Sequence, residues 1–377
     1  MADLGLQFAL IGEEIRHAID EVLASQQFVL GPQLEALEAE MARYCERRFA
    51  IGVASGTDAL TIGLRAAGVG AGDEVILPAF TFLATAGAVI AVGARPVFAD
   101  SESETLNIDP ESARSLITPR TRAIIAVHLY GGAADIEPLV ELASERGVAL
   151  IEDNAQSLGA ALGGKKLGSF GSVSATSFYP SKNLGAYGDA GMVFTDSEEI
   201  AHRALRLRNH GQIGRYVSAE PGWNSRLDEI QAAVLRVKAR YLDRWIAARR
   251  AYAARYDERL AGVNGLRPMS PRKNSFHSYY LYTIRITPQG PNLAARTDRV
   301  ARHLSAQGID TSVFYPLPLH LQPAYSSFGG KPGQLPVAER AAHEVLSLPL
   351  YPEMTHEQIE RVADAVREAL HAWPQSF

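Results

Sequence analysis

Three segments of the chain carry residues that could do chemistry together. Lys182 lies in the stretch SFYPSKNLGAYGDAG, Asp153 ends the apolar stretch VALIED, and the stretch SGTDAL begins at Ser55. An amine can form an imine, a buried carboxylate can keep a pyridine nitrogen protonated, and a helix start can hold a phosphate. Pyridoxal 5'-phosphate needs all three groups, so the sequence predicts this cofactor. Taken alone, the aspartate could cap the next segment and the lysine could be a surface charge; their combination favours the cofactor site.

Further residues near these segments could complete the site. Gly56 and Thr57 stand where a strand gives way to a helix, so their backbone N–H groups can face the phosphate. Ser177, near a strand end, can donate its hydroxyl to the same phosphate. Phe82 follows a strand and could stack on a flat ring, and Gln156 could bond the ring on its hydroxyl side. The plainer alternatives are an ordinary helix cap for the first pair and core packing for the phenylalanine.

Other motifs do not carry a function. GVGAG at 68–72 joins a helix to a strand, which is the wrong order for a dinucleotide fingerprint, and GGKKLG lacks the spacing of a phosphate-binding loop. His356 and Glu357 have no second histidine four residues on, and the nucleophile motif of α/β-hydrolases is absent. The sequence therefore predicts no metal site.

Composition narrows the class of protein. The chain has 377 residues, 47% of them hydrophobic and 21% charged, which is ordinary for a globular protein of two or three folding units. Its net charge of -5 offers no overall attraction to nucleic acid or to an anionic membrane. Cys45 is the single cysteine, and residues 81–92, the most apolar stretch, are too short to cross a bilayer. The first residues lack a signal-peptide pattern. We expect a soluble cytoplasmic protein.

Strands and helices alternate through the first half of the chain. Short apolar strands between helices predict a mostly parallel sheet covered on both faces. The strands are expected at 48–54, 73–80, 95–100, 121–130, 148–155, 172–179 and 190–196, and the helices at 11–25, 31–45, 57–68, 81–93 and 136–147.

The second half of the sequence predicts a smaller α+β unit. A nearly unbroken helical pattern at 227–260 connects the two halves, and an irregular, functional loop is expected at 317–336. The smaller unit has strands at 278–286, 311–315 and 343–351 and helices at 297–308 and 355–373. We place the boundary so that a large cofactor-binding domain covers 1–245 and a small C-terminal domain covers 246–377.

A series of ordered motifs gives the chain a family resemblance along its whole length. It is similar to the sugar aminotransferases of the DegT/DnrJ/EryC1/StrS family, whose fold is the aspartate aminotransferase-like fold type I. The resemblance is carried by GPQLEALE, SGTDAL, PAFTF, EDNAQSLGA, SFYPSKNLGAYGDAG, RNHGQ, GWNSRLDEIQAA and YPLPLHLQPAY. One departure is GDAG at 188–191, where many members have GDGG or GEGG, and it should not disturb the mechanism.

The resemblance implies a role for each predicted site residue. Lys182 corresponds to the Schiff-base lysine that is also the general acid/base; members with histidine there are dehydratases. Asp153 would pair with the pyridinium and Gln156 would contact the ring. Asn224 matches a residue that reaches the cofactor phosphate from a neighbouring subunit, which implies a homodimer with shared active sites. The remaining cofactor contacts would be Gly56, Thr57 and Ser177 at the phosphate and Phe82 stacked on the ring.

The resemblance also implies the reaction. L-Glutamate would give its amino group to the cofactor, which would pass it to the ketone of a nucleotide-linked sugar. The stretch NSRLDE is more similar to members that aminate a 3-keto sugar, whereas members acting at C4 more often have NYRM. We expect a dTDP-linked 3-oxo-6-deoxyhexose; a UDP-linked 3-keto sugar, a 4-keto nucleotide sugar and a cyclitol ketone are alternatives. A regulatory protein that binds the cofactor without turnover is an alternative of another class.

Substrate contacts are expected in two places. Tyr315 and His320 lie in a segment that resembles the sugar-contacting segment of the family, and Tyr187 is a further candidate. A structural role in a proline-rich loop is the alternative for the first two. Arg208 and His210 could face substrate phosphates or simply end a solvated helix.

Overall fold

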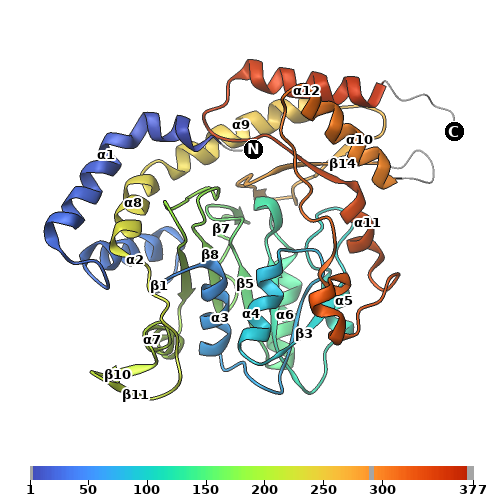
Figure 1. The fold of residues 1–377 in the computed structure, drawn as a ribbon. Helices are drawn as coiled ribbons and strands as arrows, with labels where there is room; N and C mark the ends of the chain where they lie inside the picture. The colour runs from blue at the N-terminus through green and yellow to red at the C-terminus, as the bar shows by residue number, and fades with distance from the viewer. Residues whose placement is uncertain (1–2, 288–292, 372–377) are drawn as a thin grey trace.

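A mixed seven-stranded sheet forms the centre of the molecule (Figure 1). The computed structural model describes residues 3–287 and 293–371. The strand order is β1-β9-β8-β5-β4-β2-β3, and only β9 runs antiparallel to its neighbours in this sheet. The strands are β1 (Phe49–Val53), β2 (Glu74–Pro78), β3 (Arg95–Ala99), β4 (Thr121–Val127), β5 (Ala149–Asp153), β8 (Val173–Ser177) and β9 (Gly191–Thr195).

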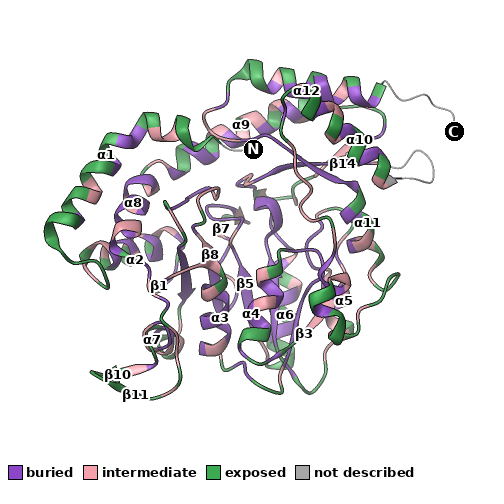
Figure 2. Ribbon diagram, in the orientation of Figure 1, coloured by how far each residue is buried: buried purple, intermediate pink, exposed green. Residues whose placement is uncertain are grey.

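Helices cover both faces of this sheet. One face packs against α3 (Gly56–Ala66), α4 (Leu83–Ala91) and α7 (Glu198–Leu207) in a single apolar core. The other face packs against α2 (Pro32–Tyr44), α5 (Pro110–Ser115), α6 (Ile136–Arg146) and α8 (Glu229–Ala239). Figure 2 shows the strands buried and α1 (Leu4–Ser25), which lies outside on α8, exposed on its outer side. Burial on both faces explains why these strands are continuous apolar runs in the sequence.

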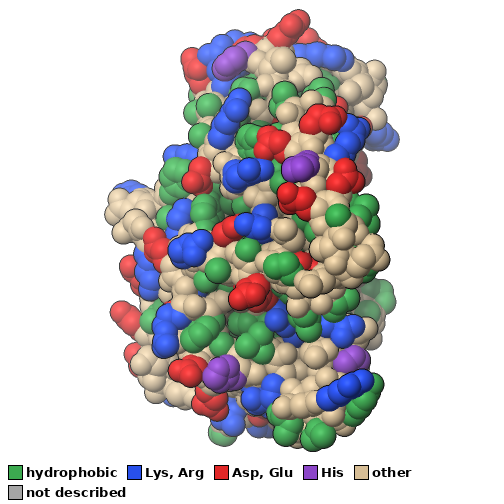
Figure 3. Space-filling view, turned by 90° about the vertical axis from the view of Figure 1, so that its left-hand side faces the viewer, with side chains coloured by type: hydrophobic (Ala, Val, Ile, Leu, Met, Phe, Trp, Pro, Cys, Tyr) green, Lys and Arg blue, Asp and Glu red, His purple; other side chains and the backbone are tan. Residues whose placement is uncertain are grey.

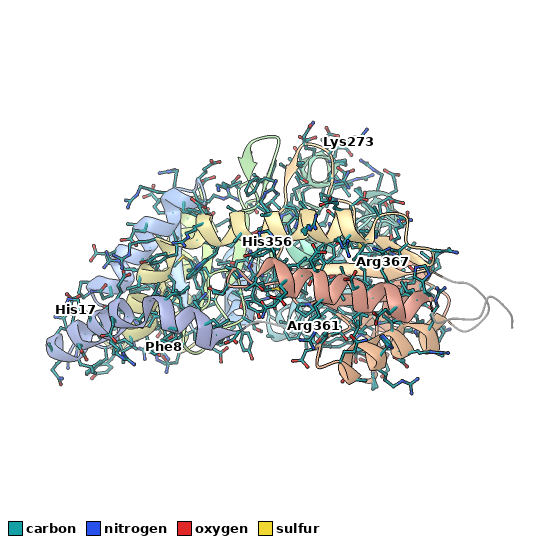
Figure 4. All side chains as sticks on the ribbon, turned by 90° about the horizontal axis from the view of Figure 1, so that it is seen from above. Phe8, His17, Lys273, His356, Arg361 and Arg367 are labelled. Atoms are coloured by element: carbon teal, nitrogen blue, oxygen red, sulfur yellow. The ribbon has the colours of Figure 1, made fainter. Side chains whose placement is uncertain are left out.

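A smaller antiparallel sheet lies in the C-terminal part. Its strand order is β12-β14-β15, and one further core joins it to the helices that cover it. Seen from above in Figure 4, α12 lies along α9, and His356 stands at the start of α12. These elements are α9 (Leu242–Leu260), β12 (Leu266–Pro268), β14 (Tyr282–Ile286), α10 (Leu293–Ala306), α11 (Pro336–Glu344), β15 (Val345–Leu348) and α12 (His356–His371).

Short elements complete the chain. A hairpin of β10 (Gln212–Gly214) and β11 (Val217–Ser218) projects from the body beside α7 (Figure 1). A three-stranded sheet joins β13 (Ser275–Phe276), β6 (Ala161–Leu162) and β7 (Lys165–Lys166). Three 3-10 turns lie at Leu129–Gly131, Leu319–Leu321 and Pro323–Phe328. The predicted α/β layering with a smaller α+β part is confirmed, whereas the boundary between 1–245 and 246–377 stays a prediction.

In the part of the chain up to α7, α1 begins at Leu4 and not at residue 11, and α5 and α7 were not predicted. Most of the other failed predictions concern the second half. The helix expected at 227–260 is interrupted at Arg240, because α8 packs on the large sheet while α9 turns to pack under α12. The expected strand 278–286 begins only at Tyr282, since Tyr279 has a positive φ of 46°. Residues 311–315 form a single bridge, from Ser312 to Ser347, and no strand. The end of the helix expected at 355–373 lies outside the described residues beyond 371.

The same region contains a helix that the sequence did not predict. α11 begins at Pro336, inside what was read as the end of a loop, and ends at Glu344. Its buried side consists mainly of alanines. Within 3–287 and 293–371, no helix is both long enough and apolar enough to cross a membrane.

Candidate active site

The predicted cofactor residues meet at the carboxyl end of the larger sheet. Asp153 ends β5, and Ser177 ends the adjacent strand β8. Lys182 follows in the loop between β8 and β9, and Gly56 opens α3 directly after β1. Ligands of α/β sheets bind at this edge, because loops and helix starts converge there. The fold therefore brings the amine, the carboxylate and the helix start to one place.

Asp153 is a buried carboxylate held by neutral donors. Its Oδ2 accepts a hydrogen bond from Thr85 Oγ1 at 3.0 Å, and its Oδ1 accepts one from the Ala155 N–H at 3.2 Å. Burial raises the pKa of the Asp153 carboxyl, and these hydrogen bonds and the charge of Lys182 offset the effect only in part. A carboxylate in this position gains strongly from a cationic partner such as a protonated pyridine nitrogen.

Lys182 is half-buried in a tightly closed loop. Its backbone N–H donates to the Tyr179 carbonyl at 2.8 Å, and the Ala186 N–H donates to the Phe178 carbonyl at 2.7 Å. Its Nζ lies 4.2 Å from the centroid of the Tyr280 ring, a cation–π contact. The loop and the ring together fix where the amine stands.

The start of α3 forms an anion cradle with Ser177. Ser55 caps the helix by accepting the N–H of Asp58 at 3.1 Å. The N–H groups of Gly56 and Thr57 in the first turn have no acceptor within the helix. A Cβ on Gly56 would stand 2.5 Å from Ser177 Cβ, so only glycine lets the strand end approach the helix start this closely. Backbone donors, a hydroxyl and the helix dipole fit a phosphate.

An exposed aromatic ring lies at the start of α4, the helix whose Thr85 bonds Asp153. Phe82 is 52% exposed, and its ring centroid lies 6.0 Å from that of Tyr315. Gln156 joins two chain segments, because its Nε2 donates to Tyr315 Oη at 2.9 Å and its Oε1 accepts the N–H of Tyr130 at 2.8 Å. An exposed ring beside a buried carboxylate can face a flat heterocycle. Its stacking on the cofactor, like the contact from Gln156, stays a prediction.

Two of the predicted substrate residues have partners elsewhere in the chain. His320 is 2% exposed, and its Nε2 lies 3.1 Å from Glu339 Oε1 on α11. Arg208 is buried and bonds Glu38 and the carbonyl of Gly52. These contacts favour the structural alternative for His320. Arg208 is buried, so it does not end a solvated helix, and its contact with a substrate phosphate stays a prediction.

Tyr187 and Asn224 are two further predicted contacts, and they lie on different segments. Tyr187 is partly exposed, and its ring lies near Phe8 of α1, which Figure 4 labels. Asn224 is exposed after the β10–β11 hairpin and forms a backbone bridge with Asn209. His210, in the left-handed region with φ 59°, precedes the same hairpin. Their contacts to substrate or to a neighbouring subunit stay predictions.

Three site residues were missed by the sequence reasoning. Thr85 lies in the α4 pattern, which gave no sign that its hydroxyl reaches Asp153 from 68 residues away. Tyr280 lies in the strand predicted at 278–286, and Tyr130 lies at the end of the strand predicted at 121–130. Each contact arises from tertiary packing, so no local motif could have revealed it.

Comparison with known proteins decides the family. A sequence model of the DegT/DnrJ/EryC1/StrS aminotransferase family matches residues 9–367. The chain belongs to this family. It is 46% identical to a protein of Geobacillus stearothermophilus named pleiotropic regulatory protein, over 98% of this chain and 97% of that one. It is 45% identical to the dTDP-3-amino-3,4,6-trideoxy-alpha-D-glucose transaminase of Streptomyces venezuelae, over 97% and 94%.

Further comparisons support the same family. The UDP-N-acetyl-3-dehydro-alpha-D-glucosamine 3-aminotransferase of Acidithiobacillus ferrooxidans is 43% identical over 98% of each chain. Among solved structures, S. venezuelae DesV matches with a TM-score of 0.95 at 44% identity, covering 99% of this chain and 98% of that one. NtdA from Bacillus subtilis with bound cofactor PMP matches with a TM-score of 0.88 at 33% identity, covering 95% and 82%.

These matches settle the fold and the class of reaction. This family member has fold type I and is a pyridoxal-phosphate-dependent transaminase, as the sequence predicted. The residues present fit the cofactor: the cradle at Gly56 and Ser177 suits its phosphate, and the buried Asp153 suits a cationic ring nitrogen.

Proposed function

We propose that this family member moves the amino group of L-glutamate onto the C3 ketone of a dTDP-linked 3-oxo-6-deoxyhexose, for amino-sugar biosynthesis. The observation that carries the proposal is the convergence of Lys182, Asp153 and the α3 start at one sheet edge, in a chain 45% identical to a dTDP-3-amino-sugar transaminase. The relatives with C3 chemistry in their names, from two different nucleotide classes, support amination at C3.

The residues divide the work between holding and proton transfer. When bound, pyridoxal phosphate supplies a ring that accepts negative charge from the carbon bearing the amino group. Asp153 would keep the ring nitrogen protonated, because a buried carboxylate favours a cation beside it. Lys182 would hold the cofactor covalently, and its Nζ would serve as the base and acid for the proton at Cα of the donor. Gly56, Thr57 and Ser177 would anchor the phosphate, so that the amine and the reacting carbon stay aligned.

The substrate assignment predicts a preference that an assay can measure. With L-glutamate as donor, a dTDP-linked 3-oxo-6-deoxyhexose should give a kcat/KM about tenfold or more above that of a dTDP-linked 4-oxo sugar, because the reacting ketone must stand beside Lys182. A UDP-linked 3-oxo sugar is the second candidate, favoured by the similarity to the A. ferrooxidans enzyme. An equal or higher kcat/KM for the 4-oxo sugar would contradict amination at C3. A higher kcat/KM for the UDP-linked 3-oxo sugar would change the proposed nucleotide from dTDP to UDP.

We also propose a homodimer with shared active sites. The projecting hairpin carries apolar side chains in solvent: Tyr216 is 84% exposed, and Ile213 and Val217 are also exposed. Hydrophobic side chains gathered on a projecting element mark an interaction surface. Figure 3 views the molecule from the α1 side and shows hydrophobic groups between charged ones of both signs. Asn224, in the segment that follows this hairpin, would then reach the partner's phosphate.

Mixing two inactive variants tests whether Asn224 acts across the dimer. Asn224→Ala and Lys182→Ala subunits, exchanged at equal amounts, should recover about a quarter of wild-type activity, because half of the dimers are mixed and each has one intact site. The alternative is a contact within one chain, since Ser225, the next residue, already bonds Asp58 of its own α3 at 2.7 Å. No recovery despite demonstrated subunit exchange would establish that alternative.

A non-catalytic regulatory protein is the competing proposal. It is suggested by the name of one relative, the pleiotropic regulatory protein. The lysine, the aspartate and the anion cradle needed for turnover are all present, so we favour the enzyme. We keep the cytoplasm as the proposed location, from the single cysteine in the sequence.

A further inference from the structure

One side of α8 lies directly beneath the loop that carries Lys182. Gln231 and Lys238, two helical turns apart, point to the same side of this helix. The Lys238 Nζ donates to the Gly185 carbonyl at 2.7 Å, and Gln231 pairs with the backbone of Tyr187, accepting its N–H at 2.8 Å. Both contacts fall within five residues of Lys182. The two side chains therefore hold the C-terminal end of its loop.

Lys238 is unusual among the lysines because it is buried. It is 1% exposed, and its Nζ also lies 4.3 Å from the centroid of the Tyr187 ring. Burying an ammonium is costly unless its hydrogen bonds and charge partners compensate. Here the acceptor is the carbonyl of Gly185, a position packed so tightly that a Cβ would stand 2.3 Å from the Pro180 carbonyl oxygen. Gly185 and Pro180 therefore close the loop around Lys182, and the Lys238 ammonium binds the loop at Gly185.

A second buried cation holds the other side of Lys182. Arg249 of α9 donates to the carbonyls of Leu350 at 2.7 Å and of Tyr280 at 3.3 Å, and the Tyr280 ring contacts the Lys182 amine. Glu353, between β15 and α12, is the acidic group that favours the charged forms of both Lys238 and Arg249. Burial nevertheless lowers the pKa of the Lys238 amine to about 8.

We propose that Lys238, assisted by Gln231, is a positioning residue for the reaction: it fixes the Gly185 end of the loop and thereby the place of the Lys182 amine. Nothing in the chemistry of transamination requires a second amine at this point, whereas proton transfer depends steeply on the distance between Lys182 Nζ and the reacting carbon. The proposal rests on the transaminase function but not on the identity of the sugar.

The test replaces the ammonium by an apolar group of similar length. In Lys238→Met, kcat for the reaction with L-glutamate should fall about tenfold with the KM for glutamate within about twofold, because placement and not binding is lost. Amide hydrogen exchange of the cofactor-loaded protein should become faster in the loop residues 178–187. It should stay unchanged in α8 itself. Arg236→Met is the matched control, since Arg236 lies on the same helix but pairs with Glu40 of α2.

Each result supports or overturns the proposal. Wild-type kcat together with unchanged exchange in 178–187 in a folded, cofactor-loaded Lys238→Met would overturn it. If that variant does not fold, Gln231→Met decides, because Gln231 is only partly buried: a loss of about threefold in kcat with faster exchange in the loop supports the proposal, and no change overturns it. If the wild type itself is inactive with L-glutamate, the donor assignment fails, and hydrogen exchange alone tests the role of Lys238.

Discussion

Lys182→Ala should abolish transamination, with kcat reduced by at least about 10⁴-fold. The variant loses both the covalent attachment of the cofactor and the base that moves the proton, and among the residues that the structure describes no other lysine is placed to substitute. Lys238, the next amine along the site, is committed to the Gly185 carbonyl. Activity is measured as 2-oxoglutarate formed from L-glutamate in the presence of the keto sugar.

A matched lysine variant controls for loss of charge and for folding. Lys165 is exposed on β7, and its Nζ lies 4.5 Å from the centroid of the Phe170 ring. Lys165→Ala should keep wild-type kcat. A Lys182→Ala protein with kcat near that of the wild type would end the assignment of this residue.

Asp153→Asn should give the second large effect, a loss of about 10²-fold or more in kcat. The amide is nearly the same size and can keep the contacts to Thr85 and Ala155, but it carries no charge to hold the ring nitrogen protonated. Asp298→Asn, an exposed position on α10, removes the same charge far from the site and should leave kcat unchanged. Wild-type kcat in Asp153→Asn would mean that the carboxylate is not the partner of the ring.

The stability of the cofactor-free protein gives an independent readout of Asp153. Burial raises the pKa of this carboxyl above its ordinary value of 3.8, so the folded state binds the proton more tightly than the unfolded state does. Between pH 3.8 and the folded-state pKa, the free energy of unfolding contributed by Asp153 therefore falls as pH rises. Asp153→Asn lacks this fall. Without cofactor, the free energy of unfolding of the variant minus that of the wild type should therefore be larger at pH 7 than below pH 4, as measured by urea unfolding.

The parts of the site that local chemistry encodes could be predicted from the sequence. Asp153 follows a buried strand and Gly56 opens a helix, so their places at the sheet edge follow from the βα pattern. Thr85 and Tyr280 could not be predicted, because their contacts join segments 68 and 98 residues away from Asp153 and Lys182. The motif around His320 predicted a contact with the substrate, whereas in the structure its ring hydrogen-bonds Glu339.

The fold shows the same division. Strongly patterned elements such as β5 and α2 were placed within a few residues, since apolar runs and the glycine-proline start mark them. The break between α8 and α9 was missed, because both helices have good helix formers and no proline or glycine marks the break. α11 was missed because it is short and begins at the last residue of the segment expected to be a loop, while its last two residues fall in the strand expected at 343–351.

The absorption spectrum of the purified protein with pyridoxal phosphate, before and after addition of L-glutamate, tests the central claim most directly. The wild type should show a visible band from the cofactor bound through Lys182, absent in Lys182→Ala, and L-glutamate should bleach it while 2-oxoglutarate appears in equal amount. A visible band that persists with glutamate would leave the cofactor site in place but contradict the glutamate-driven transamination. A wild type that binds no cofactor would contradict the assignment of the site.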